Sequence, residues 1–170
     1  VSRGGLKLEH ALTKFNINPT NQICLDIGSS TGGFTDCLLQ HGAKHIYSLD
    51  VGTHQLSDKL RHHPQVTSLE QTHFLKINQL PNSNITLITI DVSFISSEKI
   101  LLHIKKLHIT YCILHIVLLL KPQFESSPKY LRKGVIKDPK IHQKILDKFI
   151  EFYENNSIEI LNHTTSPIKG

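Results

Sequence analysis

One segment of this 170-residue sequence combines glycines, hydroxyl side chains and a carboxylate in the manner of a ligand-binding turn. It spans residues 25–34, reads LDIGSSTGGF, and lies between a short apolar run and a segment with helical spacing. In α/β proteins a turn between a strand and a helix binds polar ligands, because its backbone N–H groups and the start of the helix point at them. The segment therefore predicts a binding turn, and its details restrict the ligand.

Two better-known phosphate-binding motifs nearly match this turn, and each fails at one residue. A P-loop needs a lysine directly after its last glycine, but Phe34 follows Gly28 and Gly33, which have the P-loop spacing. A dinucleotide fingerprint needs Gly-x-Gly-x-x-Gly, but Ser30 replaces the second glycine, which lets the backbone approach a pyrophosphate. The turn therefore favours a ligand without phosphate.

Acidic residues follow the next three predicted strands, at the end where open α/β sheets bind ligands. Asp50 lies 22 residues after Gly28, the spacing of a carboxylate that binds ribose hydroxyls. S-adenosylmethionine (SAM) joins a ribose to a methionine part that has no phosphate, so it fits this set. For any single carboxylate, the alternative is a helix cap or a turn former. The predicted SAM contacts are Asp26, Gly28, Ser29, Ser30, Thr31, Gly32, Gly33, Phe34, Asp50, Val51, Glu70 and Asp91.

The elements that must position these residues alternate between strand and helix along the chain. Short runs rich in Ile, Leu and Val predict strands over residues 23–27, 45–49, 66–69, 85–90, 111–120 and 157–161. Helical spacing and start signals predict helices over residues 6–15, 34–40, 55–61, 97–107 and 139–154. Residues 124–137 read as a long loop. This pattern predicts an α/β fold with a mostly parallel, doubly wound sheet of the Rossmann type, covered on both faces.

Basic residues are concentrated in one stretch of the chain. The net charge is +5, from 19 basic and 14 acidic residues. Residues 121–148 hold eight basic and three acidic residues, an excess equal to that of the whole chain. Such a local field suits a polyanion such as RNA, while the alternative is a solvated helix face.

Cysteine usage and apolar runs restrict the class of protein further. Cys24, Cys37 and Cys112 are far apart and form no Cys-x-x-Cys pair, so we expect buried thiols in a cytoplasmic protein and no metal site. The longest apolar run, over residues 112–120, has nine residues, whereas a membrane-spanning helix needs about 20. We therefore expect no membrane span.

Seven short motifs, in order along the whole chain, carry a resemblance to a known family. They are VSRGGLKL (1–8), DIGSSTGGFTD (26–36), SLDVG (48–52), DVSFIS (91–96), KPQFE (121–125), GVIKD (134–138) and SPIKG (166–170). With these motifs the sequence resembles the TlyA-type haemolysin and rRNA 2′-O-methyltransferase family, which is related to the FtsJ-like RNA ribose methyltransferases. The resemblance implies a Rossmann-like methyltransferase domain over residues 1–170, SAM as cofactor and ribosomal RNA as partner.

The resemblance also implies the catalytic residues. FtsJ-like enzymes use a Lys-Asp-Lys-Glu set, in which Lys7, Asp91 and Lys121 match the first three members. The family's glutamate lies beyond the SPIKG segment, outside this sequence, and Glu125 is not assigned to its role. We therefore expect this chain to bind SAM but to turn over poorly. The predicted RNA contacts are Arg3, Lys7, Lys129, Arg132, Lys133 and Lys137.

The chemistry supports these assignments without the family. A ribose hydroxyl is a poor nucleophile, and a lysine beside it can stabilise developing alkoxide charge or accept its proton. An aspartate can orient that lysine, so Lys121 is the predicted central group, with Asp91 orienting it. The supporting role of Lys7 is implied by the resemblance. Without the resemblance, Lys7 reads as a surface helix lysine, and the alternative for Lys121 is a lysine that extends from a strand end into solvent. Asp91 is followed by Val-Ser-Phe and not by the Pro-Pro-aromatic motif of many base-nitrogen methyltransferases, which favours hydroxyl methylation.

Alternative functions and the domain context remain open at this point. A membrane-active haemolysin, or a SAM fold that binds RNA without catalysis, would share the same motifs. Relatives of this kind often carry an S4-like RNA-binding domain upstream and a final strand downstream, and neither is in this sequence. Without that strand, we expect residues after about 157 to be disordered, displaced, or paired with another copy by strand exchange.

Overall fold

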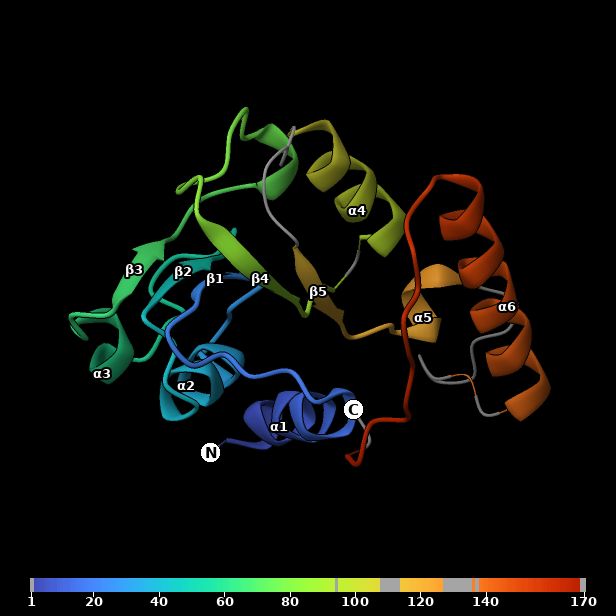
Figure 1. The fold of residues 1–170 in the computed structure, drawn as a ribbon, viewed down its shortest axis with the longest axis horizontal. Coiled ribbons are helices and arrows are strands. Elements are labelled where there is room, and N and C mark those ends of the chain that lie inside the picture. Colours follow the sequence, from blue (N-terminus) through green and yellow to red (C-terminus); the bar gives the residue numbers. More distant parts are fainter. Residues whose placement is uncertain (1, 94, 108–113, 127–135, 137, 169–170) are drawn as a thin grey trace.

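The computed structural model describes residues 2–93, 95–107, 114–126, 136 and 138–168. Within these residues, five strands form one sheet in the order β3-β2-β1-β4-β5, and every neighbouring pair is parallel (Figure 1). The strands are β1 (Ile23–Ile27), β2 (His45–Leu49), β3 (Val66–Leu69), β4 (Ile85–Ile90) and β5 (His115–Leu118). The predicted α/β fold with a parallel sheet is confirmed.

Helices cover both faces of this sheet because alternate strand residues point to opposite sides. Figure 1 shows α1 and α2 on one side of the sheet, where they bury Leu8 and Leu38 against Cys24 and Leu87. On the other side, α4 and α6 pack against a second cluster that contains the next residue of β1, Leu25. The helices are α1 (Arg3–Phe15), α2 (Gly33–Gln40), α3 (Asp58–Arg61), α4 (Ser97–Lys106), α5 (Pro122–Glu125) and α6 (Pro139–Asn155), with a 3₁₀ turn, η1 (Phe74–Lys76).

Side-chain caps fix where three of these helices begin. Ser2, Ser96 and Asp138 each accept a hydrogen bond from a backbone N–H of the first helical turn. These N–H groups have no partner within their own helix, so the caps stabilise the helix starts. All three caps, Ser2, Ser96 and Asp138, lie in motifs of the family resemblance, VSRGGLKL, DVSFIS and GVIKD.

The predicted strand over residues 157–161 is wrong. These residues belong to no strand of the described sheet and run as an extended segment beside α6 (Figure 1). Ile158 and Ile160 pack against the core cluster, which explains their alternation, but Leu161 is 71% exposed. A segment is a strand only when its backbone pairs with a neighbouring strand. Here the alternation of Ile158 and Ile160 reflects their packing against the core, without such pairing. Displacement is one of the outcomes that the sequence predicts for this segment.

Candidate active site

A cavity of about 340 Å³ lies at the carboxyl ends of β1 and β4. These two strands are neighbours where the strand order reverses, the point at which open α/β sheets bind ligands. The cavity falls within the range of roughly 300–1,000 Å³ typical of small-molecule sites. Its lining residues are Ser2, Arg3, Gly4, Gly28, Ser29, Ser30, Thr31, Gly33, Phe34, Asp91, Ser93 and Lys121.

Gly28 brings the glycine turn directly against the end of β4. Its φ of +82° is one that side chains rarely adopt, and a Cβ atom there would lie 2.5 Å from the Asp91 carbonyl oxygen. The Gly28 N–H donates to the Leu49 carbonyl at 2.9 Å, which fixes the turn to β2 as well. The glycine is therefore required by both the conformation and the close approach.

Gly33 brings the start of α1 to the rim of the cavity. A Cβ atom at Gly33 would lie 2.8 Å from the Ser2 Oγ and 3.1 Å from the Gly5 nitrogen. This close crossing of α1 and α2 places Ser2, Arg3 and Gly4 among the lining residues. The predicted RNA contact Arg3 therefore lies at the cavity itself.

Lys7 lies one helical turn after Arg3, on the same side of α1, and is half-buried. It is not among the residues that line the cavity. The other predicted RNA contacts, Lys129, Arg132, Lys133 and Lys137, lie outside the described residues. The structure thus brings Arg3 to the site and leaves Lys7 beside it.

Asp50 braces the glycine turn from the end of β2. Its Oδ2 accepts a hydrogen bond from the Ser30 N–H at 2.8 Å, and its Oδ1 accepts one from the Gly52 N–H at 2.8 Å. Ser30 has a φ of +48°, so this bond holds a residue in the left-handed region. A carboxylate offers about four acceptor positions, which leaves roughly two for ribose hydroxyls. The neighbouring Val51 is 65% exposed, although Asp50 and Val51 do not line the cavity.

Asp26 lies beneath the turn and not on the cavity. Its side chain is fully buried, with Oδ2 accepting from the Thr35 hydroxyl at 2.7 Å and Oδ1 from the Thr89 hydroxyl at 3.0 Å. Burial raises the pKa of Asp26 to about 6, against the lowering effect of these two hydrogen bonds. Thr35 also bonds the Ser48 hydroxyl at 2.8 Å, so the group ties β1, β2, β4 and α2 together.

Glu70 braces a different loop. It accepts hydrogen bonds from the His54 N–H at 2.8 Å and the Leu56 N–H at 3.3 Å, and pairs with Arg61 at 3.3 Å. The bond from the His54 N–H is the main cause that lowers the pKa of Glu70. Glu70 is therefore a structural anchor for the segment before α3 and does not line the cavity. Gly32 also lies behind the turn, where a Cβ atom would contact Leu60 and Leu56.

Lys121 and Asp91 meet in the cavity wall. The Lys121 Nζ lies 2.5 Å from the Asp91 Oδ1, and the two side chains are 20% and 23% exposed. The same Nζ donates to the Ser93 Oγ at 3.0 Å and lies 5.9 Å from the centre of the Phe124 ring. Oδ1 of Asp91 accepts no well-aligned hydrogen bond from the described residues, so the attraction is that of an ion pair. The pair joins the ends of β4 and β5, as the predicted roles require.

Three lining residues have no role in the sequence predictions: Ser2, Gly4 and Ser93. Ser2 and Gly4 lie in the VSRGGLKL motif and Ser93 in the DVSFIS motif. Their position within these motifs is the feature of the sequence that could have identified them as site residues. What each contacts depends on how α1 crosses α2 and on how β4 and β5 end, which the sequence does not display.

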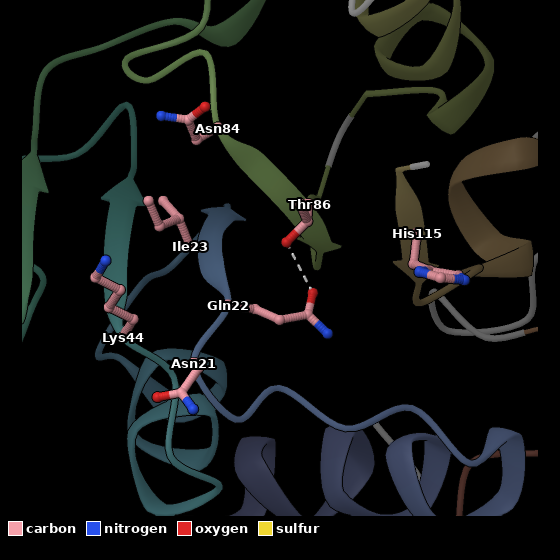
Figure 2. A pocket seen from close by; sticks show the side chains of 7 residues that line it. All are labelled: Asn21, Gln22, Ile23, Lys44, Asn84, Thr86 and His115. Carbon is pink, nitrogen blue, oxygen red and sulfur yellow. Dashed lines mark hydrogen bonds between the residues drawn. The ribbon is translucent and has the colours of Figure 1, made fainter. Parts of the chain in front are cut away.

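A larger cavity of about 500 Å³ lies at the opposite edge of the sheet, near the amino ends of β1, β4 and β5 (Figure 2). In it the Thr86 hydroxyl donates to the Gln22 Oε1 at 2.9 Å. Parallel sheets bind ligands at their carboxyl edge, and none of the glycine turn reaches this second cavity. The smaller cavity is therefore the candidate site. The second is lined by Asn21, Gln22, Ile23, Lys44, Asn84, Thr86 and His115.

The family model of FtsJ-like methyltransferases matches residues 1–170. This chain belongs to the FtsJ-like methyltransferase family. The match places the glycine turn, Asp91 and Lys121 within a methyltransferase domain whose expected Rossmann-like sheet is the one observed. The family resemblance stated from the motifs is thereby confirmed.

Relatives within this family carry two kinds of name. The chain is 47% identical over 174 residues to "Hemolysin A" of Brachyspira hyodysenteriae, covering all of this chain and 71% of the relative. It is 39% identical over 172 residues to the "23S rRNA (cytidine-2'-O)-methyltransferase TlyA" of Campylobacter jejuni, covering all of this chain and 66% of that protein. This FtsJ-like chain thus spans from about half to about seven tenths of the length of the curated relatives it matches.

Solved structures agree with the sequence relatives. A crystal structure of a candidate hemolysin from Lactococcus lactis superposes with a TM-score of 0.89 and 42% identity, covering 100% of this chain and 82% of that one. Among the described residues of this FtsJ-like domain, no helix has the length and apolar character needed to cross a bilayer.

Proposed function

We propose that this domain binds SAM in the cavity at the switch point and transfers its methyl group to a ribose 2′-hydroxyl of ribosomal RNA. The observation that carries the proposal is the Lys121–Asp91 pair in the wall of a cavity built by a glycine turn. Family membership supports methyl transfer, and the name of the TlyA relative supports the ribose of a cytidine as acceptor. A ribosomal substrate places the enzyme in the cytoplasm.

SAM fits the residues that build the cavity. The Gly28 turn lines the cavity with backbone, since its φ of +82° and its close approach to the Asp91 carbonyl leave no room for a side chain. Ser29, Ser30 and Thr31 add hydroxyl and N–H donors for a carboxylate such as that of methionine. Asp50 keeps acceptor capacity beside the turn for ribose hydroxyls. When bound, SAM supplies an activated methyl group on a positively charged sulfur.

Lys121 is the group that acts on the acceptor hydroxyl. A ribose hydroxyl is hardly ionised at neutral pH, so negative charge must develop on its oxygen as the methyl group is transferred. The Lys121 ammonium has three donors, and contacts to Asp91 and Ser93 leave one for that oxygen. Donors fixed in advance at such a position contribute on the order of 10²–10³-fold in rate.

Asp91 and α1 complete the site. Asp91 holds the ammonium in place, and its partly exposed carboxylate keeps the lysine at the cavity. Arg3, and Lys7 one turn later, present positive charge from α1 at the rim, where an RNA phosphate would be neutralised. Holding the hydroxyl in line with the methyl group contributes up to roughly 7–11 kcal/mol for ideal geometry.

The test is methyl transfer from radiolabelled SAM to purified ribosomal subunits. We expect label in RNA whose ribose is methylated, recognised because a 2′-O-methylated linkage resists alkaline cleavage. Lys121→Ala should lower the rate at least about 100-fold and leave SAM affinity within a few-fold. Lys59→Ala on the exposed face of α3 is the matched control and should change neither. Label on a base nitrogen would contradict the proposal.

The same preparation also tests the membrane-active alternative, by lysis of red cells. We expect no lysis. Lysis that survives Asp50→Ala, in a protein that transfers no methyl group, would replace the proposed function with the haemolytic one. RNA binding by the full-length protein without any turnover would instead favour a SAM fold that only binds RNA.

A further inference from the structure

Glu125 of α5 is bonded to the start of α4. Its Oε1 accepts hydrogen bonds from the Ser97 N–H at 2.8 Å and the Ser97 hydroxyl at 2.6 Å, and its Oε2 accepts one from the Ser96 hydroxyl at 2.9 Å. The first N–H groups of a helix lack partners within the helix and carry partial positive charge, so a carboxylate there is well stabilised. Ser97 is 3% exposed, and Ser96 and Glu125 are half-buried, so these bonds are partly shielded from bulk water.

These bonds connect the same two segments that carry Asp91 and Lys121. One segment leaves β4 at Asp91 and enters α4 at Ser97, while the other leaves β5, passes Lys121 and ends in Glu125. The segments therefore contact each other twice, through the Lys121–Asp91 pair and, four residues later, through Glu125 and the two serines. The parallel ladder between β4 and β5 continues up to this point, because the Leu119 N–H donates to the Ile90 carbonyl at 2.9 Å.

The segment after Lys121 is short and only partly buried. α5 has only four residues, none of them buried, and a helix of this length has little stability of its own. The Lys121 side chain has four rotatable bonds, so the place of its ammonium depends on where its backbone is held. Three hydrogen bonds to the Glu125 carboxylate restrain α5, and hydrogen bonds to a charged group are stronger than those between neutral groups.

We propose that Glu125 is a positioning residue for Lys121. It holds α5 against the start of α4 and thereby keeps the Lys121 ammonium on Asp91 and Ser93. Glu125 does not line the cavity, so it acts through the lysine and not on the substrate. The inference rests on the proposed function, because it needs Lys121 to act on the acceptor.

The test compares two carboxylates at the same helix start. Glu125→Ala should lower kcat for methyl transfer about 10–100-fold and leave the KM for SAM within about twofold. Glu98→Ala removes the acidic residue that the first turn of α4 itself carries, which has no bond to α5 in the described structure, and should leave kcat unchanged. A structural effect on α4 alone would lower both variants alike and would overturn the proposal.

A double-mutant cycle with Lys121→Ala separates positioning from other roles. If Glu125 acts through the lysine, Glu125→Ala should have no further effect on the residual rate of Lys121→Ala. Additive losses would overturn the proposal, as would a Glu125→Ala crystal structure with the Lys121–Asp91 contact unchanged. Should Glu125→Ala lose its fold by circular dichroism, Glu125→Gln, which keeps the side-chain length, takes its place in the cycle. An inactive full-length wild-type protein would contradict the proposed function itself, whereas full-length wild-type and Glu125→Ala proteins of equal activity would contradict only the positioning role.

Discussion

Gly28 is the position at which one added methyl group would disturb the cavity most directly. A Cβ atom there would lie 2.5 Å from the Asp91 carbonyl oxygen, and the φ of +82° is strained for any side chain. We expect Gly28→Ala to lower SAM affinity at least about tenfold in a calorimetric titration, because the turn must move away from β4. Unchanged affinity would show that SAM does not bind against this turn.

Gly42→Ala is the matched control for this change. Gly42 has a similar φ of +79°, but its nearest contact for a Cβ atom is the Thr20 Oγ1 at 3.3 Å, far from the cavity lining. The substitution should cost about 1 kcal/mol of unfolding free energy through the left-handed backbone. SAM affinity should stay at the wild-type value, so the two variants separate backbone strain from damage to the cavity.

Asp26 gives the protein a predictable dependence of stability on pH. Burial raises the pKa of Asp26 from 3.8 to about 6, so the folded protein holds this proton more tightly than the unfolded chain. The contribution of Asp26 to stability is therefore fully present below about pH 4 and is lost as the pH rises through about 6. Relative to Asp26→Asn, wild-type unfolding free energy should fall by roughly 2 kcal/mol between pH 4 and 7. Urea unfolding at several pH values measures this difference, and a constant difference would contradict it.

The sequence predicts residues at strand ends better than it predicts their partners. Asp91 and Lys121 were identifiable because a charged residue directly after a buried strand lies at the carboxyl edge of the sheet. Asp26 and Glu70 satisfy the same rule, yet their carboxylates bond Thr89 and His54 and do not line the cavity. These partners lie 63 and 16 residues away in sequence, and no local pattern reveals which one a carboxylate will choose.

Among the elements, the first four strands were the most predictable and the two four-residue helices, α3 and α5, the least. The bounds of β1, β2, β3 and β4 agree with the apolar runs, because each run has to be buried between two helical layers. The four-residue α5 was missed and read as loop, since one turn of helix has no periodicity to detect. Helix α3 starts at Asp58, three residues later than predicted, because the preceding residues are held by Glu70 as a loop.

Because α1 and α2 cross closely, we expect alanine to have opposite effects at two glycines that lie close together in space, Gly33 and Gly4. At Gly33 a Cβ atom would lie 3.1 Å from the Gly5 nitrogen, which is backbone and cannot yield easily. At Gly4 the nearest atoms would lie at 3.7 Å, an ordinary contact distance. We expect Gly33→Ala to destabilise the protein by about 1–3 kcal/mol and Gly4→Ala to stabilise it by about 0.5–1 kcal/mol. Denaturant unfolding measures both, and equal signs would show that the helices do not cross at these glycines.

The basic residues of the chain are concentrated in one stretch, and we expect this stretch to affect RNA binding and not SAM binding. The net charge of +5 equals the basic excess of residues 121–148, a stretch that begins at Lys121 itself. A polyanion drawn to this stretch would arrive next to Lys121, the proposed catalytic residue. Binding that neutralises phosphates depends on salt, with a slope in log K against log salt of about −0.7 for each contact to single-stranded RNA.

Replacing Lys129, Arg132, Lys133 and Lys137 with alanine should therefore weaken RNA binding and flatten its salt dependence by up to about three in slope. The control replaces Lys14, Lys44, Lys59 and Lys76, four exposed lysines in separate parts of the chain, and lowers the net charge by the same amount. It should retain most of the slope, because scattered charges do not share one phosphate backbone. Filter binding of ribosomal RNA between about 50 and 200 mM salt measures both variants. An equal loss of RNA affinity in the two variants would mean that net charge alone attracts the RNA. SAM affinity should be unchanged in both variants.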